Sequence, residues 1–121
     1  MNNTLRTSPS IRAAAIVVLA LSAASCASNA AQESGFNGFL QSIAADCKPL
    51  IIGSDNIGQA IIFNGLGAKP ENYTNFLGQT KALYNGSIPP AIYRDSLNSF
   101  LGSGTSNARS FDCIVAHLPK S

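Results

Sequence analysis

The sequence predicts an all-α fold, a compact irregular bundle of four or five short helices with one disulfide bond. Three observations predict it. From residue 36 onward, apolar residues recur at spacings of three and four, as they do on one face of a helix. Proline and glycine divide this region into short segments. Cys47 and Cys113 lie near its two ends, where a disulfide can join the first helix to the last.

The first expected helix begins after a small, polar tether and ends before Pro49, because the residue before a proline disfavours helical backbone. Its apolar stripe consists of Phe36, Phe39, Leu40, Ile43, Ala44 and Cys47. Since Cys47 lies on this stripe, we expect its disulfide to be buried.

The second expected helix is short. Residues 54–56 offer a choice of N-cap, and Asn64-Gly65 offers a stop. The apolar residues Ile57, Ala60, Ile61 and Phe63 lie between them. Branched residues are frequent in this stretch, so a strand over residues 57–63 is the alternative to the favoured helix.

The next two expected helices begin at prolines. Pro70 and Pro90 each suit the first turn of a helix, where the missing N–H costs nothing. Asn85-Gly86 ends the first of these helices and Gly102 ends the second. Their stripes are Tyr73, Phe76, Leu77, Thr80, Leu83 and Tyr84, and then Ile92, Tyr93, Leu97, Phe100 and Leu101.

The last expected helix follows the loop 102–107 and stops at Pro119. Its stripe is Ala108, Phe111, Ile114, Val115 and Leu118. A strand over residues 111–118 is the alternative.

The N-terminus has the composition of an export signal. Residues 1–12 contain Arg6 and Arg12 and no acid, and residues 13–24 are apolar except for Ser22. This run is shorter than the roughly 20 residues that a membrane span needs. The expected organisation is a signal peptide over residues 1–25, a lipidated N-terminus and tether over 26–35, and a helical domain over 36–121.

Residues 21–26 read LSAASC, with small residues directly before a cysteine. This segment resembles the lipobox of bacterial lipoproteins, although Ala23 stands where that family usually has leucine or another branched residue. The resemblance implies cleavage before Cys26 and attachment of fatty acyl chains such as palmitate to it. Ala27, in place of the aspartate associated with inner-membrane retention, implies an outer-membrane anchor facing the periplasm. The alternative is ordinary cleavage after Ala30, which would give a soluble periplasmic or secreted protein.

Either cleavage removes Cys26 from the pool of free thiols and leaves an even pair in an oxidising compartment. A Cys47–Cys113 disulfide is therefore expected. It would close a loop of about 67 residues, and the chain-entropy treatment gives roughly 4 kcal/mol of stabilisation for it.

The residues of this chain predict little chemistry. His117 lies four residues after Cys113, on the same helix face, but a Cys/His metal site requires thiolates and normally four ligands. We therefore expect a disulfide with a nearby surface or capping histidine, with no catalytic residue, metal or cofactor. Asp46 and Asp112 each adjoin a disulfide cysteine and are the one acidic pair that the fold could bring together.

Charge excludes nucleic acid as a partner. The net charge of +2 resides in Arg6 and Arg12, because residues 26–121 contain six basic and six acidic side chains. Only 12% of the chain is charged, about half the usual share. Such a surface, with Tyr73, Tyr84 and Tyr93, suits protein recognition. The function predicted is a non-catalytic protein-binding module of the envelope, such as an inhibitor or immunity protein.

Two other functions remain open. A carrier of a small apolar ligand would need an internal cavity, lined by residues such as Phe39, Ile61, Phe76 and Phe100. A small secreted enzyme would need acidic residues to converge with His117 in a cleft.

Overall fold

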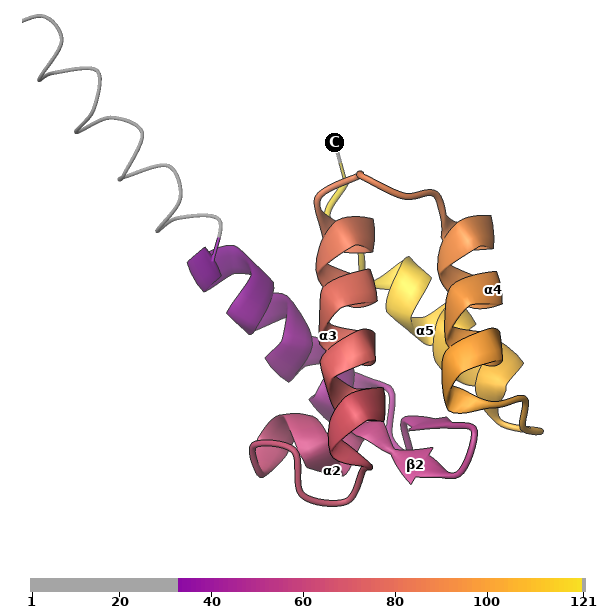
Figure 1. The fold of residues 1–121 in the computed structure, drawn as a ribbon. Helices are drawn as coiled ribbons and strands as arrows, with labels where there is room; N and C mark the ends of the chain where they lie inside the picture. The colour runs from indigo at the N-terminus through magenta and orange to yellow at the C-terminus, as the bar shows by residue number, and fades with distance from the viewer. Residues whose placement is uncertain (1–32, 121) are drawn as a thin grey trace, which may run out of the picture. The chain divides into compact units, whose positions relative to one another are not determined.

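The computed structural model describes residues 33–120, and it confirms the all-α fold with one disulfide. The elements are a helix over residues 33–46, strands β1 (Ile51–Ile52) and β2 (Asp55–Asn56), and helices α2 (Ile57–Ile62), α3 (Pro70–Tyr84), α4 (Pro90–Leu101) and α5 (Asn107–Ala116) (Figure 1). The expected signal peptide and Cys26 lie outside the described residues.

The first helix has the apolar stripe that its spacing predicts. Every residue of that stripe, from Phe36 to Cys47, is at most 8% exposed. The helix begins before this stripe, because residues 33–35 are also helical. Helix propagation explains this, because each added residue gains a backbone hydrogen bond once a helix exists. From Phe36 onward, the described residues form one compact unit.

A small antiparallel hairpin follows, which the sequence did not predict. Ile51 pairs with Asn56 and Ile52 pairs with Asp55, around the two-residue loop Gly53-Ser54. Gly53 has φ +62°, and a Cβ there would lie 2.3 Å from the carbonyl oxygen of Leu101. The hairpin therefore requires glycine for its turn and for its close approach to the end of α4.

Residues 57–62 form the helix α2, so the favoured helix is confirmed and the alternative strand is wrong. Asn56 is its N-cap, and the Asn56 side chain accepts a hydrogen bond from the Gln59 N–H. At the other end the Gly65 N–H donates to the Ala60 carbonyl over 2.7 Å, while Asn64 and Gly65 both have positive φ. Ile57, Ala60 and Ile61 are buried, whereas Phe63 is 53% exposed. The helix ends at Ile62, and Phe63 does not continue its buried face.

α3 and α4 are antiparallel neighbours joined by a short connection (Figure 1). Pro70 and Pro90 occupy their first turns, as expected. Inside the pair, Thr80 and Tyr93 are both fully buried and their hydroxyl oxygens lie 2.9 Å apart. Two residues of the expected α4 stripe, Ile92 and Phe100, are 51% and 50% exposed. The buried face of α4 is instead the narrower line of Tyr93, Leu97 and Leu101.

α5 is also a helix rather than a strand, and it lies behind α4 in Figure 1. Phe111 and Ile114 enter the core, whereas Ala108 is exposed, contrary to expectation. Position 108 is in the first turn of α5, and the buried residues of that turn are the polar Asn107 and Ser110. These polar residues bond to the hairpin region, so the start of α5 is attached by hydrogen bonds instead of apolar contact.

Candidate functional site

The predicted disulfide is present. Cys47 lies in the turn after the first helix and Cys113 lies on α5, with the sulfur atoms 2.02 Å apart and the Cα atoms 5.8 Å apart. Cys47 is 1% exposed, as its place on the apolar stripe predicts, while Cys113 is half-buried. The bond joins the end of the first helix to the last helix, so it links the two ends of the domain covalently.

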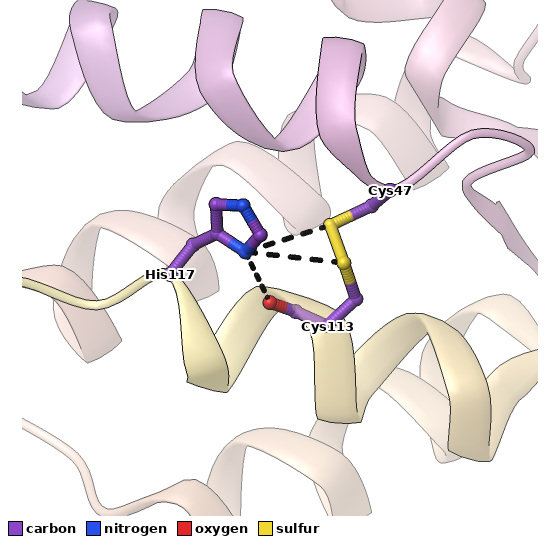
Figure 2. Close-up of side chains that lie close together, drawn as sticks. All are labelled: Cys47, Cys113 and His117. Carbon is purple, nitrogen blue, oxygen red and sulfur yellow. Dashed lines mark hydrogen bonds between the residues drawn. A yellow bond between two sulfur atoms is a disulfide. The ribbon is translucent and has the colours of Figure 1, made fainter.

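His117 lies directly against this disulfide. It is the C-cap of α5, one turn after Cys113, and its Nδ1 is 3.9 Å from each of the two sulfur atoms (Figure 2). Nδ1 is also 2.8 Å from the Cys113 carbonyl oxygen, and Nε2 is 3.1 Å from Oδ2 of Asp46. The ring is thus held between a carbonyl of its own helix and a carboxylate of the first helix.

Both neighbours of the ring nitrogens are acceptors, which favours the doubly protonated imidazolium. The hydrogen bond to the Cys113 carbonyl, and next the one to Asp46, raise the pKa of His117 above its usual value. Partial burial opposes this rise, because it disfavours the charged form. The position at a helix C-terminus also suits a cation. His117 is therefore both a capping residue, as expected, and the centre of a charged contact between two helices.

Asp46 and Asp112, the acidic pair that the sequence offers, each contact a different basic side chain. Asp46 pairs with His117, whereas Asp112 binds Arg94 of α4 over 2.7 Å. Asp55 is 5% exposed and accepts from the Asn72 side chain over 2.7 Å and from the Lys69 N–H over 3.3 Å. Its contacts fasten the start of α3 to the hairpin, which is a structural role.

Three of the large apolar side chains that are exposed among residues 33–120 lie near one another in the chain, which the sequence did not predict. Ile62, Phe63 and Leu66 are 47%, 53% and 71% exposed, at the end of α2 and in the turn after it. Beside them is a groove of about 440 Å³, lined by Ala44, Lys48, Pro49, Leu50, Asn56, Gly58, Gln59, Ile62 and Phe63. We call Ile62, Phe63, Leu66 and this groove the α2 surface. The signal in the sequence was the run IIF directly before a glycine-rich turn, which places apolar side chains beyond the end of a helix.

The three tyrosines proposed as partner contacts have different positions. Tyr93 has no exposed surface, and burial raises the pKa of its hydroxyl, so it is a core residue and the expectation of a surface contact is corrected. Tyr84 is half-buried against the rings of Phe36 and Phe39, with centroids 5.6 Å and 5.3 Å away. Tyr73 is half-buried with its ring against Gly65, so it borders the α2 surface.

The residues suggested for a ligand cavity do not gather around one. Phe39, Ile61 and Phe76 are packed within the apolar core, but Phe100 is half exposed on α4. Within residues 33–120, no helix has both the length and the apolar character needed to cross a bilayer.

Comparisons with models of protein families, with curated protein sequences and with solved structures find no match for this chain. Two features of the described residues therefore bear on function: the α2 surface, and the cluster of His117 with the disulfide.

Proposed function

We propose that this protein is a small bacterial envelope lipoprotein that binds another protein through its α2 surface, without catalysis. The supporting observation is the exposure of Ile62, Phe63 and Leu66 beside one groove. Large apolar side chains clustered on a surface typically mark a site of protein association. An inhibitor or immunity protein would use such a surface.

The makeup of the α2 surface suits a protein partner better than a small ligand. Leu66 is the most exposed of its apolar residues and does not line the groove, so the apolar area extends past the groove. Tyr73 continues it on α3 with an aromatic ring, the kind of residue enriched in interfaces. A ligand bound in the groove alone would leave this outer area in water.

Rigidity supports the same function. The groove is formed by α2 and by residues 44–50, next to the disulfide at Cys47. The carbonyl of Leu50 accepts from the N–H groups of Ile57 and Gly58 over 2.9 Å and 3.1 Å, which fixes the start of α2 on this segment. A preformed surface loses less conformational entropy on binding.

Crosslinking in living cells tests the binding surface. The full chain carrying Phe63→Ser and Leu66→Ser should lose a partner that the unchanged chain captures. A chain carrying Ile92→Ser and Phe100→Ser is the matched control, because these side chains are also about half exposed but lie eight residues apart on α4. Eight helical residues span about 12 Å, so they form no continuous patch. Equal capture by all three chains, or no capture by the unchanged chain, would refute the proposal.

The anchor has a separate test. Intact mass spectrometry of the membrane-extracted protein should show a chain that starts at acylated Cys26 and lacks two hydrogens at Cys47 and Cys113. Such a chain would sit in the outer membrane and face the periplasm. A chain starting at residue 31, without acyl groups, would instead identify a soluble periplasmic or secreted protein.

A further inference from the structure

We infer that the reduced form of this protein binds a divalent metal ion of the zinc type through Cys47 Sγ, Cys113 Sγ and His117 Nδ1. This inference is independent of the proposed partner binding, because Cys47, Cys113 and His117 are not part of the α2 surface. It concerns the chain before the disulfide forms, or after a reductant has opened it.

The three ligand atoms already lie close to one another in the oxidised protein. All three are within 4.8 Å of one another, and Nδ1 is 3.9 Å from each sulfur atom (Figure 2). In a tetrahedral zinc site, with Zn–S of about 2.3 Å and Zn–N of about 2.0–2.1 Å, a sulfur and a nitrogen ligand are about 3.6 Å apart. Two sulfur ligands of such a site are about 3.8 Å apart, so the sulfur atoms must move apart from 2.02 Å once the disulfide is open.

Thiolate and imidazole are the ligands that zinc prefers in proteins. Three protein ligands leave one tetrahedral position for water. His117 is half-buried and Cys113 is half-buried, so this fourth position has access to solvent. The site would thus have the open coordination of three-ligand zinc sites, and would lack the four protein ligands of a closed structural site.

Asp46 supplies the support that metal-binding histidines usually have. Its Oδ2 is 3.1 Å from Nε2, the ring nitrogen that would not touch the metal. A carboxylate there accepts a hydrogen bond from Nε2–H, fixes the tautomer and makes Nδ1 a stronger ligand. The Cys113 carbonyl would lose the Nδ1 contact, but it would keep the backbone hydrogen bond from the His117 N–H over 3.2 Å. The helix end therefore remains capped.

A phosphine can serve as the reductant that opens the Cys47–Cys113 disulfide. The phosphine and one water molecule convert the disulfide to two thiols and give the phosphine oxide. A divalent ion then displaces the two thiol protons, and also the Nδ1 proton when the imidazole is doubly protonated. Two thiolates neutralise the charge of the ion, and the bound imidazole is neutral.

Cobalt absorption tests the inference, since thiolate ligands give a sulfur-to-cobalt charge-transfer band. The full chain with Cys26→Ser, which leaves only the two relevant thiols, is reduced with a phosphine and titrated with Co²⁺. We expect one equivalent bound with thiolate charge transfer, displacement by Zn²⁺, and a helical circular dichroism spectrum in the metal form. The oxidised chain should show no charge-transfer band.

Three variants separate a specific site from binding by loose thiols. His117→Gln should weaken Co²⁺ binding by more than about 100-fold, and Asp46→Asn by about 10- to 100-fold as a supporting residue. Asp95→Asn, an exposed acid on α4, is the matched control and should bind like the parent. Binding unaffected by His117→Gln, or a reduced chain that binds no Co²⁺ or stays unfolded with it, would overturn the inference.

Discussion

α5 and α2 attach to the same segment, residues 47–56, in opposite ways. α5 is held by specific links: the disulfide, two hydrogen bonds from Arg109 to the carbonyls of Lys48 and Pro49, and one of 2.7 Å from Ser110 to the Ile51 carbonyl. α2 is held by backbone hydrogen bonds at its first turn and by apolar packing, and its last residue, Ile62, and the following Phe63 are exposed.

This difference separates stability from recognition. The disulfide and these hydrogen bonds add to the apolar contacts of Phe111 and Ile114 in holding α5, which suits a small domain whose core is limited. α2 contributes to the core with one face only and keeps large apolar side chains in water. Changes at α5 should therefore alter the free energy of unfolding, and changes at the outer face of α2 should alter binding.

The largest effect is expected from removing the disulfide. The double substitution Cys47→Ser and Cys113→Ser should lower the free energy of unfolding by roughly 4 kcal/mol, because the unfolded chain regains the freedom of a 66-residue separation. Denaturant unfolding measures it, with Cys26→Ser as the control that leaves the bond intact. A loss below about 1 kcal/mol would mean that the hydrogen bonds of α5 suffice to hold it.

Asn107→Ala should have the next largest effect. This 4% exposed side chain accepts from the Gly53 N–H over 2.8 Å and donates to Asn98 and to the Gly102 carbonyl. Its loss leaves these groups without partners, at a cost of about 1–3 kcal/mol. Asn37→Ala, on the exposed side of the first helix, is the control and should change little. Similar denaturation midpoints for the two variants would contradict the prediction.

The contribution of His117 should depend on pH. Because the pKa of His117 is raised in the folded state, its stabilisation is fully present below the unfolded pKa of about 6.5 and is lost as pH rises through the folded value. The deficit of His117→Gln relative to the unchanged protein should therefore be larger at pH 5 than at pH 9. Thermal unfolding at both pH values measures this. A deficit that grew with pH would show that the imidazole is bound in its neutral form.

The smallest effect on stability is expected at the α2 surface. Phe63→Ser with Leu66→Ser should change the free energy of unfolding by no more than about 0.5 kcal/mol, since both side chains are already more than half exposed. Denaturant unfolding beside the Ile92→Ser and Phe100→Ser chain measures it. A loss of 2 kcal/mol or more would place Phe63 and Leu66 among the residues that support the fold, and the contrast between the two helices would disappear.

Much of the fold follows from local patterns in the sequence. The first helix, both proline-initiated helices and the disulfide are where spacing and cysteine parity predict them. Helix periodicity and capping act within a few residues, so a single sequence contains them. The hairpin was missed because strands of two residues carry no periodicity, and the Gly53 turn is needed for an approach to Leu101, 48 positions away.

In the candidate sites too, local spacing predicts some of the contacts and not others. The 113–117 spacing predicts that Cys113 and His117 share a helix face, and they do. Asp46 contacts His117, whereas Asp112 contacts Arg94. These partners depend on how α5 packs against the first helix and α4. The same holds for Tyr93, which periodicity could not distinguish from Tyr73 or Tyr84 as a surface residue.

The sequence by itself determined the all-α class, the helix ends at proline and glycine, and the pairing of Cys47 with Cys113. Each of these depends on backbone preference or on the number of available thiols. Only the tertiary structure decided which apolar residues stay in water, because exposure depends on the neighbours that cover a face. It therefore buried Tyr93, exposed Phe63 and Phe100, and placed His117 between two sulfur atoms and a carboxylate.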